Sequence, residues 1–470
     1  MKKIKIYIQH SKIIADLITP VGAYLRLRDK YQNALLLESA DYHDHSDSKS
    51  FICLEPIAGF EAQGTCFEQY FPDQTITRRS SQPPKQVFEA FKSFIACFEV
   101  ASNPPHVQSA GLYGYSSFEA LRYMEDIDCN VPISKGKDNP DLKYQLFRYV
   151  LVFNHFNNEL HLLQNSFSED EPIDGLHKLR ELICGQSAAG FAFNKQGTES
   201  SSITDQQFRE SVARGIAHCQ RGDVFQVVFS REFRHSFTGD EFNVYRSLRS
   251  INPSPYLFYF DYGDFRIFGS SPESQLFIEE GKAYINPIAG TVRRSHDPKE
   301  DLKRAKHLKN DPKENAEHVM LVDLARNDLS KHSHNVQVEC YAEVQNFSHV
   351  IHMVSKVSGQ MQEGTSALDV YAATFPAGTL SGAPKYKAIE LINENESTSR
   401  NFYGGAIGFF GFNGTVNHAI IIRSVLSKNN ELIYQAGAGV VAASSPENEL
   451  QEVYNKVAAI QSAITNAESL

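Results

Sequence analysis

The amino-acid sequence predicts an α+β fold, because strand-like runs follow one another as hairpins instead of alternating with helices. The runs at 148–156 (RYVLVFNHF) and 159–165 (ELHLLQN) are joined through an Asn-Asn pair, which favours a tight hairpin turn. Two further hairpins are predicted to turn at Gly263 and Gly281. A Rossmann-like sheet would need repeated βαβ units, so this order of elements disfavours it.

Composition narrows the class of protein. A chain of 470 residues that is 41% hydrophobic and 22% charged is typical of a soluble globular protein with two or three domains. Its net charge of −10, without a basic run, disfavours binding to nucleic acid or to an acidic membrane surface. No apolar stretch is long enough to span a membrane. The 7 cysteines form no C-x-x-C motif, which favours reduced thiols in a cytoplasmic protein.

One soft stretch divides the chain. Residues 185–204, GQSAAGFAFNKQGTESSSIT, are rich in glycine, serine and polar residues, which predicts a linker or crossing loop. The division gives an N-terminal region, 1–184, and a C-terminal region, 205–470. Thr204 and Gln207 at the boundary form a T-x-x-Q capping box, which predicts the start of a helix.

The chain contains two pairs of glutamates with the same i, i+3 spacing: Glu314 with Glu317, and Glu449 with Glu452. Both pairs lie in predicted long helices, near 313–329 and 447–465, so each pair presents its carboxylates on one helix face. Two such faces across a cleft would concentrate negative charge. Mg²⁺, held by one or two carboxylates and by substrate oxygens, would neutralise it. The spacing therefore suggests a magnesium enzyme that acts on an anionic substrate.

The alternative for these glutamates is a solvated helix surface, since glutamate is a good helix former. Asp311 also has the position of a helix N-cap, with Pro312 in the first helical position. Glu314 could then be only the third residue of a capping box.

Two glycine-containing segments carry weak signals of their own. The segment 377–392, AGTLSGAPKYKAIELI, has Ser381 as a candidate N-cap, and its entry could offer backbone N–H groups to a carboxylate or phosphate. A plain loop-to-helix junction is the alternative. Gly437 and Gly439, two apart in a predicted strand, indicate either a close approach to the backbone or a bulge.

Four polar side chains stand out for their surroundings. Arg423 lies in an apolar strand, where a guanidinium should meet an acid of the protein or of a ligand. Lys456 either pairs with the glutamate one turn before it or reaches a ligand. His352 is either a core histidine or a site residue. Glu273, after Pro272 at a strand end, is a turn residue or a general acid–base.

Across residues 223–457 the motifs DVFQVVFSREF, NPSPY, GSSPE, PIAGT, ENAEHVMLVDLARNDL, TFPAGTLSGAPK, YGGAIGFFGF and QAGAGVV…SPENELQEVYNK occur in one order. The chain thereby resembles the chorismate-utilising enzymes, and within them most closely the family of anthranilate synthase large subunits. LLLESAD at 35–41 extends the resemblance to nearly the whole chain. It implies large antiparallel β-sheets packed face to face with helices outside.

Two positions bear on the choice of reaction within this superfamily. Relatives that add water carry a lysine base where this chain has Gln226, and an amide cannot act as that base. Aminodeoxychorismate synthases carry a nucleophilic lysine where this chain has Ala289. The combination implies that ammonia is the nucleophile and that no covalent ring intermediate forms.

The implied reaction joins chorismate and ammonia and then releases pyruvate. Mg²⁺ would be held mainly by Glu317 and Glu452, with the other two glutamates in support, next to the ring carboxylate. The implied catalytic residues are Glu273, as general acid–base while ammonia attacks, His352, which assists the departing group, and Gln226. The residues implied to hold chorismate are Gly290, Thr291, Thr379, Tyr403, Arg423, Gly437, Ala438, Gly439 and Lys456.

The resemblance also implies partners. Ammonia would come from a separate glutamine amidotransferase subunit (component II), because no such domain fits in this sequence. Tryptophan would act as a feedback inhibitor. Its pocket would be built from Glu38 and Ser39 on one side, and from Pro255, Tyr256 and Leu257 on the other.

Two competing interpretations stay open. An aminodeoxychorismate synthase has the same fold and first step, and it can carry a similar N-terminal pocket. A catalytically silent, tryptophan-binding regulatory subunit is the second. The chain itself contains no tryptophan, which fits either selection for translation under tryptophan scarcity or chance composition.

Overall fold

Antiparallel hairpins form where the sequence predicts them. The computed structural model describes residues 3–39, 48–81, 83–102, 110–127, 131–185, 188–295, 297–346 and 350–470. Strands β8 (Leu142–Asn154) and β9 (Glu159–Ser166) pair antiparallel. The predicted turns at Gly263 and Gly281 join two further strand pairs, and both glycines have a positive φ, +85° and +73°. Glycine adopts this conformation without steric cost, which fixes the turn positions.

The first sheet is built around strands β3 and β8. Its order is β6 (Phe98–Ser102), β1 (Ile4–Ile14), β9, β8, β3 (Lys49–Gln63), β2 (Leu35–Glu38), β12 (Tyr256–Asp261), β13 (Phe265–Ser271), β22 (Ser424–Lys428), β23 (Glu431–Val440), β11 (Gln226–Gly239) and β10 (Phe193–Ser201). Among the described strands, β1 with β6 is the one parallel pairing within it. Short strand β19 (Gly382–Ala383) pairs with the start of β11.

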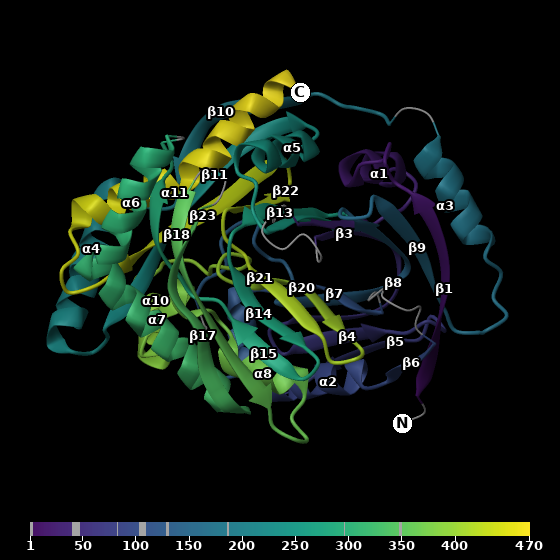
Figure 1. The fold of residues 1–470 in the computed structure, drawn as a ribbon, viewed down its shortest axis with the longest axis horizontal. Helices are drawn as coiled ribbons and strands as arrows, with labels where there is room; N and C mark the ends of the chain where they lie inside the picture. Colours follow the sequence, from purple (N-terminus) through teal and green to yellow (C-terminus); the bar gives the residue numbers. More distant parts are fainter. Residues whose placement is uncertain are drawn as a thin grey trace.

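The second sheet branches from the N-terminal half of β8. It continues through β7 (Gly111–Ser116), β20 (Ala406–Gly411), β21 (Val416–Ile420), β14 (Ser274–Glu279), β15 (Lys282–Ile285) and β18 (Val350–Met361), which also pairs with β16 (Ile288–Arg293) and β17 (Ser333–Asn346). β4 (Cys66–Tyr70) and β5 (Ile76–Ser80) extend it beside β3. The α+β prediction, with large antiparallel sheets, is confirmed (Figure 1).

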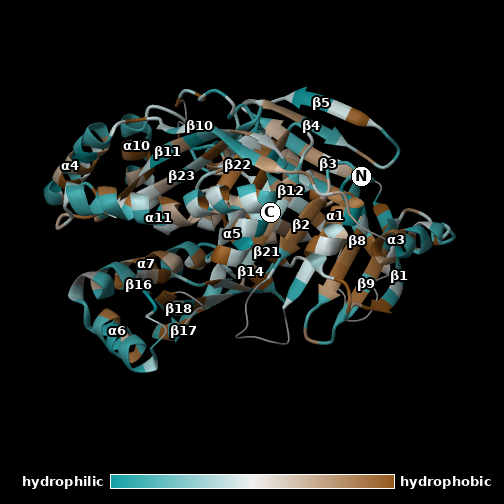
Figure 2. Cartoon of the chain, turned by 90° about the horizontal axis from the view of Figure 1, so that it is seen from above, coloured by the Kyte–Doolittle hydropathy of each residue, from teal (hydrophilic) through white to brown (hydrophobic). Residues whose placement is uncertain are grey.

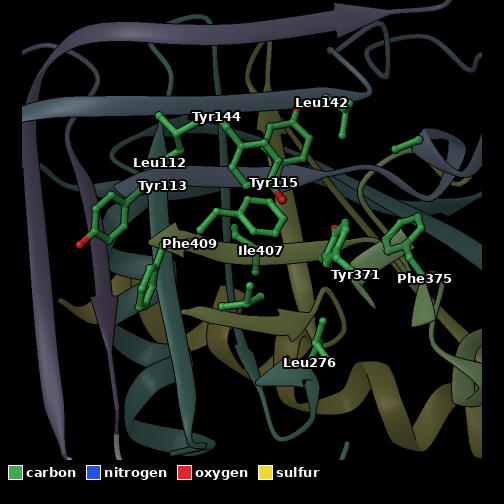
Figure 3. Packing of buried hydrophobic residues seen from close by; sticks show 14 of the residues in the cluster. Leu112, Tyr113, Tyr115, Leu142, Tyr144, Leu276, Tyr371, Phe375, Ile407 and Phe409 are labelled. Atoms are coloured by element: carbon green, nitrogen blue, oxygen red, sulfur yellow. The ribbon is translucent and has the colours of Figure 1, made fainter. Parts of the chain in front are cut away.

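The main core lies between the two sheets. Phe51 of β3 and Phe409 of β20 face each other, with ring centroids 6.2 Å apart. Tyr113 of β7 packs on Phe409, and Tyr115 of β7 and Tyr144 of β8 lie with it around β20 (Figure 3). Because each strand alternates its side chains between two faces, these large apolar residues fill one face and hold the sheets together.

Helices cover the outer faces. α11 (Pro446–Asn466) packs over β23, and α4 (Asp205–Arg221) packs over β11 and β23. α5 (Phe242–Ile251) packs beside α11 over β12 and β13, where Tyr245 contacts Tyr259 of β12 at a centroid distance of 5.6 Å (Figure 1). The remaining helices are α1 (Pro20–Leu27), α2 (Lys85–Ile95), α3 (Asp174–Cys184), α6 (Pro298–Asn310), α7 (Pro312–Ser330), α8 (Ala367–Thr374), α9 (Gly378–Ser381), α10 (Lys385–Asn395) and two short 3₁₀ turns (Phe118–Tyr123 and Ala467–Ser469). Hydrophilic residues dominate the exposed helices α4 and α6 (Figure 2).

The prediction of a linker or crossing loop at 185–204 is wrong for residues 193–201, which form a strand. Phe193–Ser201 forms β10, which pairs with β11 at the edge of the first sheet. Its side chains after the first residue are mostly exposed, so the strand lacks the apolar alternation that would reveal it. The boundary also does not separate two sheets, because β2 pairs with β12 and β7 pairs with β20.

The capping box of Thr204 and Gln207 is confirmed at the start of α4. Ser381, by contrast, is not the N-cap of the next helix, because α10 begins only at Lys385. Pro384 disfavours a helical conformation in the residue before it, which explains the later start. No helix in the described part of the chain combines the length and apolar character that crossing a bilayer requires.

Candidate active site

Helix α7 begins as predicted and carries its first glutamate pair over β16. The N–H of Glu314 donates to Asp311 Oδ1 at 3.1 Å, which confirms the aspartate as the cap. Gly290 has φ +70°, and a Cβ placed on it would lie 3.0 Å from Glu314 Oε2. The glycine therefore admits the carboxylate of Glu314 next to the strand.

The second glutamate of this pair is bound from β11. Gln226 Nε2 donates to Glu317 Oε1 at 3.2 Å. The same nitrogen would lie 2.3 Å from a Cβ on Gly439 in β23, so only glycine leaves room for the amide. Gln226 thus joins α7 to the glycine segment of β23, and the predicted close approach to this strand is confirmed.

Helix α11 contacts the glycine segment of β23 at Gly437. Lys456 Nζ pairs with Glu452 Oε1 at 2.7 Å and also donates to the carbonyl oxygen of Gly437 at 2.9 Å. Glu449, on the same helix face, is buried. Both glutamate pairs are therefore connected to Gly437–Gly439, one through an amide and the other through a lysine.

The carboxylate oxygens of these helices are hard donors of the type that Mg²⁺ prefers. In the described residues, no group of three or more His, Cys, Asp or Glu side chains is arranged to enclose a metal ion. A donor set of one or two carboxylates fits Mg²⁺, since this ion usually keeps waters and substrate oxygens among its ligands.

Glu273 is a buried carboxyl immediately before β14. Thr379 Oγ1 donates to Glu273 Oε1 at 3.0 Å. Burial raises the pKa of Glu273 to about 7, while the Thr379 hydroxyl and the charges of Lys456 and Arg423 oppose the rise. A carboxyl with a pKa near 7 can both give and take a proton at neutral pH.

Arg423 contacts an amide and not an acid of the protein, which leaves an acid of a ligand as the predicted partner. Its Nη1 donates to Asn252 Oδ1 at 3.3 Å, and among the described residues it has no ion pair within 4.0 Å. Burial lowers the pKa of Arg423, and the charge of Glu273 opposes this. Its φ of +49° turns it out of the regular strand at the start of β22. The guanidinium thus retains donors for an anionic ligand.

His352 belongs to the same group of residues. It is 2% exposed, and its Nδ1 lies 3.3 Å from the carbonyl oxygen of Gly290. A carbonyl can only accept, so this contact places the proton on Nδ1. Burial and the charge of Arg423 lower the pKa of His352 to about 4, which keeps the ring neutral near pH 7.

The remaining predicted substrate residues lie around the same strand. A Cβ on Gly437 would lie 3.0 Å from Tyr403 Oη, so the phenol approaches the β23 backbone closely. The methyl group of Ala438 packs into the helix-side core, which leaves only its backbone for a ligand. Thr291 is opposite His352 in the β16–β18 register.

The residues predicted for the inhibitor pocket lie on neighbouring strands. Leu257 of β12 is directly opposite Glu38 of β2. Glu38 is 5% exposed and accepts from Tyr245 Oη at 2.7 Å and from Arg249 Nε at 2.9 Å. Ser39 follows Glu38 at the end of β2, Pro255 precedes β12, and Tyr256 begins it.

Sequence reasoning missed the helix that binds Glu38. Tyr245 and Arg249 are four apart on α5, a spacing that places both on one face. This spacing could have been noticed, but nothing in the sequence says that α5 lies beside β2. Asn252, the partner of Arg423, lies in the NPSPY motif that also builds the pocket wall.

The fold and the carboxylate-rich site define a class of enzyme. A family model described as chorismate binding enzyme matches residues 50–462, and the chain belongs to this family. The resemblance inferred from the sequence motifs is confirmed.

Several relatives within this family are similar to the chain over nearly its whole length. Anthranilate synthase component 1 of Neisseria meningitidis serogroup B is 37% identical over 462 residues, which cover 96% of this chain and 93% of that protein. The component 1 protein of Aquifex aeolicus is 34% identical over 481 residues, with 98% and 94% covered. The crystal structure of anthranilate synthase component I from Streptococcus pneumoniae TIGR4 superposes with a TM-score of 0.75 at 30% identity, covering 95% of this chain and 98% of that chain. Menaquinone-specific isochorismate synthase from Escherichia coli shares the fold, with a TM-score of 0.73 at 17% identity over 98% of this chain and 95% of that one.

Proposed function

We propose that this chain is the chorismate-converting large subunit of an anthranilate synthase. It joins ammonia to chorismate and releases anthranilate and pyruvate, the first step of tryptophan biosynthesis. The observation that carries the proposal is the pair of Gln226 and Ala289 inside the assembled site. The amide of Gln226 is committed to Glu317, and Ala289 on β16 offers no nucleophile.

Chorismate carries two carboxylates, and the site has two cations for them. Arg423 retains guanidinium donors beyond its contact with Asn252, and Lys456 stands between Glu452 and the β23 backbone. The Gly437–Gly439 segment allows a flat ring to approach the strand closely. These groups would bind and orient the substrate, which converts the reaction with ammonia into a well-aligned encounter.

Glu273 would then act as the acid of the first step. As ammonia forms the bond to C2, the bond between C4 and its hydroxyl oxygen breaks. The protonated carboxyl of Glu273 gives its hydrogen to this hydroxyl, which leaves as water. Thr379 holds the carboxyl in position through its own hydroxyl. The attacking nitrogen loses one proton, so the proton given by Glu273 can be restored and no outside oxidant or reductant is needed.

His352 would serve the second step. Its Nδ1 faces Gly290, so Nε2 is the nitrogen with the accepting lone pair. A neutral imidazole can take the ring proton at C2 while the C3–O bond breaks, the electron pair leaves with the enolpyruvyl group and the ring becomes aromatic. The proton taken by His352 can then pass to the departing group, which becomes pyruvate. Glu317 and Glu452, with Glu314 and Glu449 in support, would hold Mg²⁺, which would supply positive charge to stabilise the ring carboxylate.

Two partners belong to this proposal. A separate glutamine amidotransferase subunit would supply the ammonia, and the names of the component 1 relatives support a multi-component enzyme. Tryptophan would inhibit by binding beside Glu38, whose carboxylate sits in a buried cluster with Tyr245 and Arg249. A carboxylate in such a cluster is suited to an ammonium group.

The test is the complete reaction with single omissions. Purified chain is incubated with chorismate, ammonium and Mg²⁺, and each component is left out in turn. Anthranilate fluorescence that requires all of them supports the proposal. Because the chain contains no tryptophan, fluorescence of added tryptophan reports binding directly. Tryptophan binding without turnover would instead identify a regulatory subunit.

A further inference from the structure

A small cavity lies behind Glu273, on the side toward α7. Its volume is about 40 Å³, and its polar wall consists of Glu273, Ser274, Gln275, Thr374 and Thr379. This volume exceeds the roughly 10–15 Å³ that one water molecule needs. The remaining wall is mainly apolar and includes Leu321 and Leu324 of α7.

The polar atoms of this wall are not all paired. Gln275 Nε2 donates to Thr374 Oγ1 at 3.1 Å, and that hydroxyl donates to the carbonyl oxygen of Tyr371 at 3.1 Å. These bonds fix the orientation of the amide of Gln275. Gln275 and Ser274 are buried, with exposed fractions of 3% and 7%. Within the described residues, Gln275 Oε1 and Ser274 Oγ nevertheless have no hydrogen-bond partner. A buried acceptor without a partner is costly, so native proteins usually satisfy it with protein or water.

We propose that this cavity binds a water molecule that donates to Gln275 Oε1 and presents its oxygen to Glu273. In this orientation the water accepts a hydrogen bond from the protonated carboxyl and opposes the carboxylate. Gln275 is then a positioning residue that keeps Glu273 in its acid form. The catalytic importance of this water rests on the proposed function, because the acid form is needed only if Glu273 protonates the leaving hydroxyl.

The raised pKa of Glu273 agrees with this arrangement, because burial already favours the neutral carboxyl and the water would add a hydrogen-bond acceptor for it. Water is preferred over ammonia as the occupant. Near pH 7 ammonia is present mainly as ammonium, which has no lone pair and cannot accept a hydrogen bond from the protonated carboxyl of Glu273, whereas water both donates and accepts.

The test measures the pKa of Glu273 without turnover. The carboxyl band is titrated by infrared spectroscopy and assigned by its absence in Glu273→Gln. Gln275→Met keeps the volume but removes the acceptor, so the water can turn a hydrogen toward the carboxylate. The expected result is a fall in the pKa of Glu273 by about one unit. An unchanged or higher pKa overturns the proposal.

Gln145 provides a matched control. It is also a buried glutamine, its Nε2 donates to Tyr70 Oη at 2.9 Å, and within the described residues its Oε1 has no partner. Gln145→Met should leave the pKa of Glu273 unchanged, and an equal fall in this variant contradicts the proposal. If Gln275→Met does not fold, Gln275→Asn withdraws the same oxygen, and a smaller fall in the same direction is expected.

Infrared titration of the wild-type protein also tests whether ammonia occupies the cavity. If the infrared titration of the wild-type protein shifts with millimolar ammonium chloride but not with sodium chloride, the cavity holds ammonia and the proposal is wrong. Failure of the proposed function is a separate result. A wild-type protein that forms no anthranilate refutes the function, whereas the titration still decides whether the water is bound.

Discussion

Gln226 donates an amide hydrogen to Glu317 Oε1 across 3.2 Å, and the same nitrogen occupies the space that a Cβ on Gly439 would need, 2.3 Å away. Three elements, β11, α7 and β23, are therefore tied together at one side chain. The residue that the resemblance implies to separate ammonia-using from water-using enzymes thus also contacts one of the proposed metal ligands. This double role leads to the first prediction.

Gly439→Ala should displace the amide of Gln226 and break its bond to Glu317. Because a well-packed site must shift to admit the methyl group, we expect a loss of about 1–3 kcal/mol in stability and a fall of about a hundredfold in kcat/KM. Thermal unfolding and steady-state kinetics measure both. Gly190→Ala is the control, since nothing lies within 4 Å of a Cβ at that position. Equal kinetics in the two variants would contradict the account.

Glu452→Gln should remove Mg²⁺-dependent turnover while the protein stays folded. The expected loss is at least about a hundredfold, because a carboxylate ligand is replaced by a neutral amide. Turnover is measured across a Mg²⁺ titration. Glu447→Gln on the same helix, with a side chain that is 70% exposed, provides the control. Full activity in Glu452→Gln would refute the metal assignment.

The pH dependence of kcat should follow Glu273. Its pKa is raised to about 7, and the proposed acid form exists below this value, so kcat should fall as pH rises through about 7. His352, with a pKa of about 4, stays neutral over this range and adds no limb near pH 7. A pH profile of kcat from about pH 5.5 to 8.5 measures this. If residual activity of Glu273→Gln keeps the same limb, the limb belongs to another group.

Glu38→Gln should weaken inhibition by tryptophan. Loss of a buried carboxylate partner for the ammonium group is worth at least about tenfold in affinity. The change is read from the fluorescence of added tryptophan and from the concentration that halves each variant's own activity. Glu55→Gln, on the adjacent strand β3 with a side chain 46% exposed, is the comparison. Unaltered inhibition in Glu38→Gln would place the inhibitor elsewhere.

Part of this site could be predicted from the sequence because its signals are local. The i, i+3 spacing and the Asp311 cap place two carboxylates on α7, and both features depend only on helix geometry. The two glycines of β23 likewise indicated that another group approaches this strand closely, and Gln226 does so at Gly439. These signals identify helices, caps and close approaches without the fold.

Other features depend on tertiary pairing and could not be read from the chain. In the register of β11 with β23, Val228 is opposite Gly439. Gln226 lies two residues before Val228 on the same face of β11, so this register brings its side chain against Gly439. The bond from Arg423 to Asn252 joins positions 171 apart. Strand β10 was not predicted, because an exposed edge strand needs no alternation of apolar and polar residues.

The central claim is that this chain takes chorismate through both steps with ammonia as the nucleophile. The most direct measurement is product stoichiometry from chorismate, ¹⁵N-ammonium and Mg²⁺, read by mass spectrometry and by a coupled pyruvate assay. The account predicts equal amounts of ¹⁵N-anthranilate and pyruvate. Accumulation of a non-aromatic amino product without pyruvate would contradict it and would identify an aminodeoxychorismate synthase.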